Sequence, residues 1–508
     1  MLARVYSAAV HGVDAILVEV EVDVVGGLPR LDVVGLAEGP VRESKERVRL
    51  ALKNSGFSLP ARRLMVNLAP ADLKKEGAAY DLPIAVGVLA ALDLLRAPML
   101  QQYVLLGELS FDGRVKAIRG ALPIAAAARR KGFRGILLPR DNAGEAAVVD
   151  GIQALPVTTL SEAVGFLRGE GEIEPVRVDL QALFAQDTAH DVDFHEVKGQ
   201  QHVKRALEVA AAGGHNVLMV GPPGSGKTML AKRIPTILPA LTLAEALETS
   251  RVHSVVGLLD GRALLTRRPF RAPHHTISDA GLIGGGTIPK PGEVSLAHNG
   301  VLFLDELPEF RKNVLEVLRQ PLEEQRITIS RVMGSITYPA RCMLVAAMNP
   351  CPCGFLGDPS KECSCSPLQV QRYRSRLSGP LLDRIDIHVE VPAVRFSELV
   401  QATPGECSAA IRERVDRARK VQLERFGGRR LFCNAQMGSR ELARFCRLDS
   451  TSEKLLESAM VRLGLSARAY TRVLKVARTV ADLDGEEAIR PAHVAEAVQY
   501  RSLDRPVA

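Results

Sequence analysis

The segment with the clearest chemistry is a glycine-rich loop between an apolar run at 216–220 and a helix-forming run that starts at Met229. Glycines are needed there because the backbone must curl until successive N–H groups point at one phosphate, and a Cβ would block that approach. The positive end of the following helix would face the same anion. The pattern therefore predicts a phosphate-binding loop made of Gly221, Pro222, Pro223, Gly224, Ser225, Gly226, Lys227 and Thr228.

Two side chains of this loop and two carboxylates further along the chain are suited to share a magnesium nucleotide. We expect the Lys227 ammonium to contact the β and γ phosphates of ATP and the Thr228 hydroxyl to coordinate Mg²⁺. Asp305 and Glu306 follow the apolar run 300–304, and the carboxyl end of a parallel strand faces the nucleotide. There Asp305 would hold Mg²⁺ through water, and Glu306 would act as the base for the attacking water. The alternative, two acids that cap the next helix, is disfavoured by the loop upstream.

A third apolar run, 343–348, ends at Asn349, whose amide can orient a water opposite the γ phosphate. In this context Asn349 resembles the first sensor of the AAA+ ATPases. Residues 378–386, which contain Arg384, resemble the arginine-finger segment of that superfamily, and Arg468 lies in a segment that resembles its second sensor. A planar cation that bridges two phosphate oxygens suits the charge of the transition state. Neighbouring arginines compete for these two roles, namely Arg372, Arg374, Arg376 and Arg472.

The arginine finger has a consequence for assembly. If Arg384 reaches the nucleotide of a neighbouring subunit, the active unit is a ring, and we predict a homo-hexamer. Three further segments, 269–286, 291–300 and 377–391, extend the likeness to known proteins over nearly the whole chain. On these residues the chain resembles the ComM/YifB group of bacterial magnesium chelatase-like competence proteins, an AAA+ branch with an insert in helix 2. The resemblance implies a hexameric motor on single-stranded and branched DNA that promotes branch migration during natural transformation.

The alternation of strand-like and helix-like segments predicts an α/β fold with several parts. These parts are an N-terminal block at 1–167, a linker at 168–193, an ATPase core at 194–392 and a helical lid at 393–508. Among the expected elements are a strand at 15–25 and helices at 40–55, 411–426 and 452–463.

The N-terminal block resembles the Lon-protease domain, which has a ribosomal S5 domain 2-like fold. Where Lon carries its nucleophile, this chain reads Lys75-Glu-Gly-Ala-Ala-Tyr-Asp-Leu-Pro83. Where Lon's lysine follows a Gly-Arg-Val turn, this chain runs from Gly113 to Leu122. Neither member of the peptidase dyad is in place, and a hydroxyl without its base is inert. The resemblance therefore implies a scaffold or a DNA-contacting collar rather than a protease.

Residues 327–338 alternate β-branched side chains about a glycine-containing turn, which predicts a hairpin just before the sensor strand. Arg331, near its tip, would follow a DNA phosphate, and the loop at 284–286 would provide a second contact. Such contacts to the DNA backbone give weak sequence preference and strong salt dependence. The alternative for Arg331 is a solvated hairpin charge. His274 and His275 are expected to pack and hydrogen-bond rather than to bind metal or bases.

Four of the eight cysteines lie within fifteen residues, as two pairs separated by nine residues. Thiolates with this spacing can close a tetrahedral Zn²⁺ site that would staple a loop too short and too rich in glycine and proline for a core of its own. The ligands would be Cys351, Cys353, Cys363 and Cys365, and the alternative is four thiols without metal. The remaining four, Cys342, Cys407, Cys433 and Cys446, are expected to be packed thiols.

Composition limits the other possibilities. The chain has no tryptophan and an aromatic content of 4%, which disfavours a carbohydrate or sterol pocket walled by large rings. No apolar run is long enough to cross a bilayer and the first residues do not resemble a secretion signal, so we expect no membrane partner and a cytoplasmic location. The net charge is +8, and residues 395–508 hold 21 basic against 15 acidic side chains. This basic end is a candidate polyanion surface, although the charge alone favours the alternative of solubility and ion pairs along helix faces.

Two other functions fit parts of this pattern. A chelatase-type ATPase that remodels a protein partner and inserts metal into a tetrapyrrole would have the same core. The Lon-like block and the basic helical end argue against it. An ATP-dependent protease is opposed by the missing dyad.

Overall fold

The computed structural model describes residues 2–36, 39–186, 190–286, 289–331, 334–358, 361–393, 405–428 and 431–501. The chain forms two compact units, here called unit 1 (1–187 and 242–266) and unit 2 (188–241 and 267–508). Each unit has a large hydrophobic core of its own. Residues 242–266 therefore pack in unit 1, although the sequence analysis placed them within the ATPase core at 194–392.

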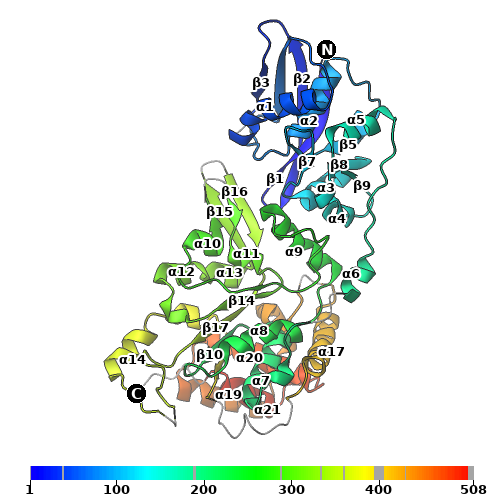
Figure 1. Ribbon diagram of the computed structural model, residues 1–508. Helices are drawn as coiled ribbons and strands as arrows, with labels where there is room; N and C mark the ends of the chain where they lie inside the picture. Colours follow the sequence, from blue (N-terminus) through cyan, green and yellow to red (C-terminus); the bar gives the residue numbers. More distant parts are fainter. Residues whose placement is uncertain are drawn as a thin grey trace. The chain divides into compact units, whose positions relative to one another are not determined.

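Unit 1 is built on a seven-stranded mixed sheet (Figure 1). In spatial order its strands are β3 (Leu31–Val34), β4 (Arg63–Ala69), β2 (Asp14–Val25), β1 (Ala3–His11), β5 (Tyr103–Leu105), β8 (Gly135–Pro139) and β9 (Gln153–Val157). The pairs β1–β2 and β2–β4 are antiparallel, and the other pairs are parallel. A short hairpin joins β6 (Glu108–Leu109) to β7 (Val115–Lys116). The strand expected at 15–25 is confirmed as β2, in which Val18, Val20 and Val22 are fully buried.

Helices cover this sheet and bury its apolar side chains. They are α1 (Gly39–Asn54), α2 (Asp81–Ala91), α3 (Ala121–Arg130), α4 (Arg140–Ala147), α5 (Leu160–Arg168), α9 (Leu243–Val256) and the 3-10 turn η1 (Leu100–Gln102). A further short helix, α6 (Leu180–Gln186), follows α5 along the chain. The helix expected at 40–55 is confirmed as α1. The segment expected as a linker at 168–193 contains α6, a helix that the weak periodicity of its sequence did not indicate.

The helix α9 joins unit 1 through both apolar and polar contacts. Leu247 packs against the cluster formed by α3, α4 and the neighbouring strands. Ser254 Oγ donates a 2.7 Å hydrogen bond to Glu145 Oε2, and the Gly120 amide donates to the Ser254 carbonyl at 3.0 Å. Burial raises the pKa of the Glu145 carboxyl, and the bonds from Ser254 and Asn142 oppose that shift. A buried carboxylate needs hydrogen-bond partners, and Ser254 of α9 supplies one of them.

Unit 2 is built on a five-stranded parallel sheet (Figure 1). In spatial order its strands are β11 (Phe270–Arg271), β14 (Val301–Leu304), β17 (Met343–Met348), β10 (Val217–Val220) and β18 (Ile387–Glu390). The three strands predicted at 216–220, 300–304 and 343–348 are its central members. Each is buried on both faces, which explains why each reads as an unbroken apolar run.

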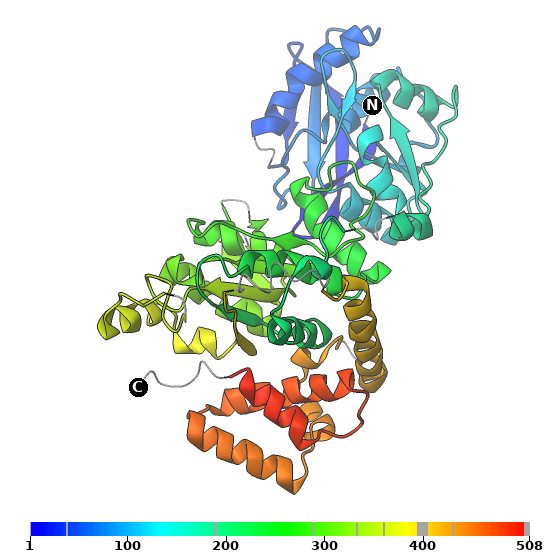
Figure 2. The ribbon, with the colours of Figure 1, turned by 60° about the horizontal axis from the view of Figure 1, so that its bottom comes forward.

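Helices flank this sheet and continue into a helical layer, the lid (Figure 2). Around the sheet lie η2 (Phe194–Glu196), α7 (Gln201–Gly213), α8 (Lys227–Ile237), α10 (Asp279–Ile283), α11 (Glu293–Leu296), η3 (Leu307–Glu309), α12 (Lys312–Val317), α13 (Arg319–Glu324), α14 (Pro367–Arg374) and α15 (Gly379–Leu382). The lid contains α17 (Ser408–Phe426), η4 (Asn434–Gln436), α18 (Ser439–Phe445), α19 (Ser450–Leu463), α20 (Ala467–Leu483) and α21 (Pro491–Gln499). The helices predicted at 411–426 and 452–463 are confirmed as α17 and α19.

A buried ion pair ties the lid to the sheet. Arg472 of α20 lies 2.8 Å from Asp386 Oδ1, and the Asn216 amide at the start of β10 donates to Asp386 Oδ2 at 2.9 Å. Asp386 is 1% exposed. Burial opposes its ionisation, but the Arg472 guanidinium, His215 and the Asn216 amide together outweigh burial and hold the pKa of Asp386 well below its usual range. Through Asp386, the lid is therefore linked to β10, the strand that leads into the phosphate-binding loop.

Two small hairpins lie together at one end of unit 2. The predicted hairpin at 327–338 is confirmed as β15 (Arg326–Arg331) paired with β16 (Gly334–Pro339). The second joins β12 (Gly284–Gly285) to β13 (Lys290–Pro291), between α10 and α11. The Tyr338 hydroxyl donates a 2.7 Å bond to the Pro289 carbonyl, which links the two. We call β12, β13, β15 and β16 the hairpin–insert module.

Across the part of the chain that the structure describes, every helix is too short or too polar to traverse a lipid bilayer.

Candidate active site

The predicted phosphate-binding loop follows the central strand β10 and leads directly into α8. Gly226, the residue before α8, has a φ of +88°, a left-handed conformation that a side chain would strain. The first turn of α8 therefore faces the loop with its free N–H groups, as an anion-binding loop requires.

The Lys227 side chain is folded into this loop. Its Nζ donates to the Gly221 carbonyl at 2.7 Å and to the Pro222 carbonyl at 2.8 Å, and it lies 3.3 Å from Asn349 Oδ1. Burial lowers the pKa of Lys227, while the carboxylates of Asp305 and Glu306 oppose that shift. The structure thus brings the loop cation and the predicted sensor amide together.

Thr228 and Asp305 form the second link across the site. Thr228 Oγ1 donates a 2.6 Å hydrogen bond to Asp305 Oδ2, and the Glu306 amide donates to Asp305 Oδ1 at 2.9 Å. A hydroxyl and a carboxylate are hard oxygen ligands of the kind that Mg²⁺ uses beside phosphate and water. The donor set therefore fits a magnesium nucleotide.

Glu306 borders a polar pocket of about 440 Å³. Its backbone is left-handed, with a φ of +53°, and its side chain is 60% exposed. The pocket is lined by Glu306, Glu309, Asn349, Pro352, Gln369, Arg372, Tyr373 and Arg376. A carboxylate and an amide that follow the neighbouring parallel strands β14 and β17 are suited to position a water beside a phosphate.

The arginines that compete for the finger and sensor roles differ in their exposure and in their partners. Arg384 is 5% exposed, and its guanidinium lies 2.6 Å from Glu323 Oε1 and donates to the Pro380 carbonyl. Arg472 is held by Asp386, whereas Arg468 is exposed in the first turn of α20. Arg376 contacts both oxygens of Glu309 at 2.8 and 2.9 Å. In this conformation Arg384 does not project from the surface, and its role as a finger stays a prediction.

A histidine pair completes the surroundings of Glu306. The rings of His274 and His275 pack against each other with centroids 4.1 Å apart and planes tilted by 34°, so the packing expected from the sequence is present. The sequence did not indicate that His275 Nδ1 also lies 3.5 Å from Glu306 Oε2. This contact depends on the position of β11 beside β14, and β11 has only two residues, too few for a recognisable strand pattern.

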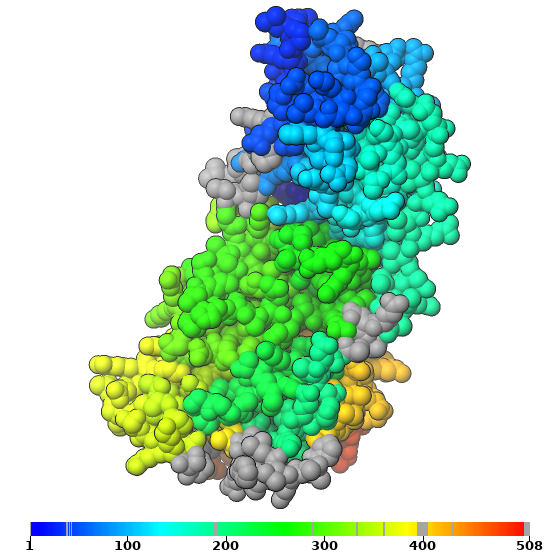
Figure 3. Space-filling model, in the orientation of Figure 1, coloured from blue at the N-terminus to red at the C-terminus, as the bar shows by residue number. Residues whose placement is uncertain are grey.

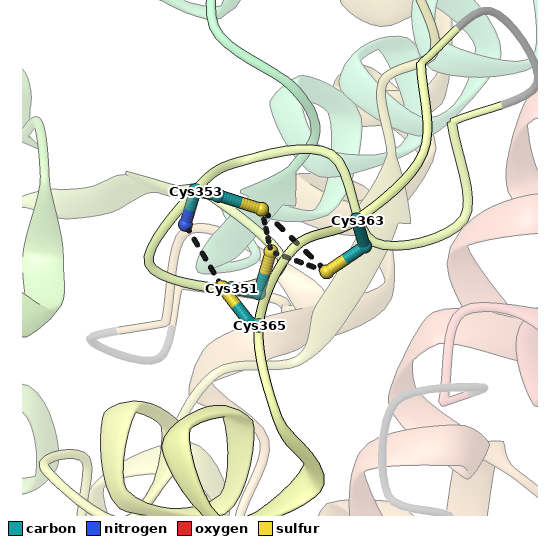
Figure 4. A group of neighbouring side chains, drawn as sticks. All are labelled: Cys351, Cys353, Cys363 and Cys365. Atoms are coloured by element: carbon teal, nitrogen blue, oxygen red, sulfur yellow. Dashed lines mark hydrogen bonds between the residues drawn. The ribbon is translucent and has the colours of Figure 1, made fainter.

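The four clustered cysteines point toward one another (Figure 4). Their sulfur atoms all lie within 4.8 Å of one another, and Cys351 Sγ is 3.3 Å from Cys353 Sγ and 3.6 Å from Cys363 Sγ. Zn–S bonds of about 2.3 Å in a tetrahedron separate the sulfurs by about 3.8 Å. Hydrogen bonds, the largest of them from the Phe355 amide, lower the pKa of the Cys353 thiol, whereas the neighbouring sulfurs of Cys351 and Cys353 raise the pKa of Cys363 and Cys365. The cluster therefore favours ionisation at Cys353, and the thiolate is the form that binds metal. The side chains present therefore fit Zn²⁺.

The loop that carries these cysteines contacts the nucleotide site. Gly354 lies so close to the phosphate-binding loop that a Cβ there would be 2.6 Å from Pro223 Cδ. Cys351 follows the sensor Asn349 by two residues, and Cys365 precedes Ser366, which caps α14. Arg374 of α14 donates back to the Pro350 carbonyl at 3.3 Å. Both the loop and α14 lie at the surface of unit 2, in yellow in Figure 3.

The other cysteines divide into buried and exposed thiols. Cys433 and Cys446 are buried, and burial raises the pKa of Cys342 to about 12. Cys407 is exposed, so the expectation that it is packed is wrong.

Arg331, the predicted DNA contact, lies at the end of β15. It is exposed, and its guanidinium donates to the Gly286 carbonyl at 3.4 Å and to the Ser330 carbonyl at 3.0 Å. The side chain is therefore turned along the module, with neighbouring carbonyls as its partners.

The segment of unit 1 that was compared with the Lon nucleophile holds buried charges instead of a hydroxyl dyad. Lys75 is fully buried, and its ammonium donates to the Pro70 carbonyl. Asp81 is also buried and is paired with Arg47 at 2.7 Å. These contacts are structural, because each charge is satisfied within the fold.

Comparisons with known proteins agree with this architecture over the whole chain. Family models described as magnesium chelatase subunit ChlI match residues 193–399 and 20–142, and the model of the ChlI C-terminal region matches 405–501. Competence protein ComM of Haemophilus influenzae is 48% identical over 508 residues, which cover 99% of this chain and 98% of that protein. The chain belongs to the ComM/YifB family.

Other similar sequences include a second YifB protein and, at lower identity, a magnesium-chelatase subunit. The uncharacterized protein YifB of Escherichia coli is 46% identical over 507 residues, with 99% of this chain and 98% of that protein covered. The magnesium-chelatase 38 kDa subunit of Rhodobacter capsulatus is 23% identical over 323 residues, which cover 59% of this chain and 84% of the subunit. This ComM/YifB chain therefore carries a magnesium chelatase-like AAA+ core on a parallel sheet.

Proposed function

We propose that this chain is an ATP-driven DNA motor that works as a homo-hexamer and promotes branch migration during natural transformation. The observation that carries the proposal is the contact between Thr228 and Asp305, which joins the phosphate-binding loop to the acidic strand end. The printed name of the Haemophilus relative, a competence protein, supports the biological setting.

In this proposal each residue of the site has one task. Lys227 binds the β and γ phosphates, and Thr228 and Asp305 hold Mg²⁺. Glu306 takes the proton of the attacking water, and Asn349 orients that water. The bound magnesium supplies charge neutralisation at the phosphates. Arg384 from a neighbouring subunit and Arg468 stabilise the charge that develops at the γ phosphate.

The metal cluster has a structural task in the same proposal. Cys351, Cys353, Cys363 and Cys365 bind one Zn²⁺, which fixes the loop against Pro223 and the sensor strand. Such a site replaces the hydrophobic core that a short loop lacks.

The DNA contacts are assigned to the hairpin–insert module. We interpret α10, β12, β13 and α11 as the helix 2 position of an AAA+ core, interrupted by an inserted hairpin. Arg331 would exchange its carbonyl partners for a DNA phosphate. Unit 1 would serve as a Lon-like collar without peptidase activity, and the eight thiols free of disulfides suit a cytoplasmic location.

The second candidate is a chelatase-type ATPase that remodels a protein partner during metal insertion into a tetrapyrrole. It is favoured by the magnesium chelatase models, which match residues in the N-terminal block, in the ATPase core and in the helical lid. The two functions differ in their ligand, since only the motor responds to DNA.

Strand displacement from a labelled synthetic four-way junction tests the proposal. We expect ATP-dependent displacement by the wild-type chain, ATP turnover that rises with junction DNA, and loss of both in Lys227→Ala. Arg331→Ala should reduce displacement while it leaves DNA-free turnover unchanged, and Arg326→Ala on the same hairpin is its matched control. ATP turnover that ignores DNA, with no displacement, would refute the motor and favour remodelling.

A further inference from the structure

One helix supplies half of the polar pocket that Glu306 and Asn349 border. We call this cavity of about 440 Å³ the α14 pocket. The side chains on this side have the i, i+3, i+4 and i+7 spacing of one helix face, on α14 and in the turn after it, and they are Gln369, Arg372, Tyr373 and Arg376. The proposed function gives these four residues no task.

Two amide side chains of the pocket have their carbonyl oxygens already engaged. Asn349 Oδ1 lies 3.3 Å from Lys227 Nζ. Gln369 Oε1 accepts a 2.8 Å hydrogen bond from the Ser366 amide, as part of the capping box of α14. Each amide side chain has one acceptor oxygen and one NH₂ donor group. The NH₂ groups of both residues are therefore the ends that remain for a ligand in the pocket.

The two arginines of the pocket differ in their partners. The Arg376 guanidinium contacts both oxygens of Glu309 at 2.8 and 2.9 Å and donates to the Pro308 carbonyl, so its charge is neutralised. Arg372 is exposed, and within the described ranges of the chain its guanidinium has neither an ion-pair nor a hydrogen-bond partner. A free guanidinium beside two NH₂ donors suits an anion with several acceptor oxygens.

The helix that carries these donors is attached to the end of the sensor strand. Tyr373 is buried, and its hydroxyl is hydrogen-bonded by the Asn349 backbone. Arg374 donates to the Pro350 carbonyl at 3.3 Å. The α14 pocket therefore lies next to Asn349 and Lys227, at the place where the γ phosphate would be cleaved. Inorganic phosphate is the anion that hydrolysis produces there.

We propose that the α14 pocket holds the inorganic phosphate released from ATP and that Arg372 is the cation that binds it. The guanidinium and the two NH₂ groups donate to phosphate oxygens, and the Glu306 carboxylate accepts from the P–OH group of monohydrogen phosphate. No covalent step follows the hydrolysis itself. Retention in the pocket separates cleavage from product release. The inference rests on the ATP hydrolysis in the proposed function and not on the DNA motor.

Equilibrium dialysis of radiolabelled phosphate against the full chain, saturated with Mg·ADP at constant ionic strength, tests the proposal. We expect saturable binding by the wild type and an affinity at least about tenfold lower in Arg372→Ala, because a charge-assisted contact is lost. Arg372→Lys keeps the charge without the planar fork, so its affinity should lie between the two. Arg440→Ala, at an exposed arginine of α18, is the matched control and should bind as the wild type does.

The absence of saturable binding by the wild type, or equal affinities in wild type and Arg372→Ala, would overturn the proposal. Thermal unfolding and ADP binding check the structure of each variant, and if Arg372→Ala fails to fold, Arg372→Lys decides by the same comparison. Competitive displacement of the phosphate by a single-stranded oligonucleotide would assign the donors to the DNA backbone and also overturn it. A wild-type chain that does not hydrolyse ATP refutes the proposed function, yet dialysis with ADP still decides whether the pocket holds phosphate.

Discussion

Thr228 Oγ1 donates a 2.6 Å hydrogen bond to Asp305 Oδ2, although the two residues are 77 positions apart. The contact exists because β10 and β14 both border β17 and end at the same edge of a parallel sheet. Asp305 directly follows β14, and Thr228 lies in the first turn of α8, which the phosphate-binding loop joins to β10. A magnesium nucleotide at this edge would exchange one internal bond for two metal ligands.

Glu306→Gln should bind ATP with unchanged affinity and hydrolyse it about 10²- to 10⁴-fold more slowly. The amide keeps the size of the side chain and leaves Asp305 and Thr228 in place, but it cannot accept the proton of the water. Single-turnover hydrolysis and binding of a nucleotide analogue measure the two effects. Glu309→Gln, in the same pocket but paired with Arg376, should retain most activity. Normal turnover in Glu306→Gln would contradict the assignment.

Arg468→Ala and Arg472→Ala should affect different properties, ATP turnover in the first and stability in the second, although the two residues lie one turn apart on α20. Arg468 is exposed, so its loss should slow ATP turnover about tenfold or more and leave thermal stability unchanged. Loss of Arg472 leaves the Asp386 carboxylate buried without its cation, which typically costs about 3–5 kcal/mol. Thermal unfolding and ATPase assays on both variants separate these outcomes. Equal destabilisation by the two substitutions would remove the distinction.

The sequence predicts the local elements of this chain well because their signals are local. Residues 216–220 and 343–348 read as buried strands from their apolar runs, and the loop after Val220 has a backbone requirement that few sequences meet. The partnership of Thr228 and Asp305 follows from the geometry of parallel sheets. No reference to distant packing is needed for these inferences.

Other features depend on tertiary packing and could not be predicted. The docking of α9 on unit 1 involves Leu247, which packs on a distant cluster, and Ser254, whose partner Glu145 lies 109 residues away. Burial of Arg384 depends on Glu323, and the sequence marks neither as a partner of the other. The orientation of His275 toward Glu306 requires the position of β11, a strand of two residues with too little pattern to recognise.

Removal of Zn²⁺ should weaken nucleotide binding as well as the loop itself. Cys353→Ser and Cys363→Ser should each bind less than about a tenth of the wild-type zinc, because thiolates cannot be replaced by hydroxyls in such sites. We expect ATP affinity to fall several-fold, since the loop packs on Pro223. Metal analysis and nucleotide titration measure both effects, with Cys407→Ser as the exposed control. Wild-type protein without stoichiometric zinc would contradict the site.

Asp193 should make unit 2 sensitive to acid below about pH 4. Burial opposes ionisation of this carboxyl, but the amides of His195 and Ser408 donate to it at 2.8 and 3.0 Å and hold its pKa at about 2, against 3.8 for an unperturbed Asp. Because the folded-state pKa is the lower one, the stabilisation is complete above the unfolded-state value. It is lost as pH falls from about 4 to about 2.

The expected size of this contribution is about 1–2 kcal/mol, since the Asp193 side chain is 31% exposed and solvent screens part of the interaction. Asp193→Asn removes the titrating group, so its denaturant midpoint should change less than that of wild type between pH 5 and pH 2.5. Circular dichroism of urea unfolding at these two values measures the difference. Asp191→Asn, two residues earlier and exposed, should follow the wild-type curve. An Asp193→Asn protein that loses as much stability as wild type over this range would show that the hydrogen bonds to Asp193 do not contribute to acid sensitivity.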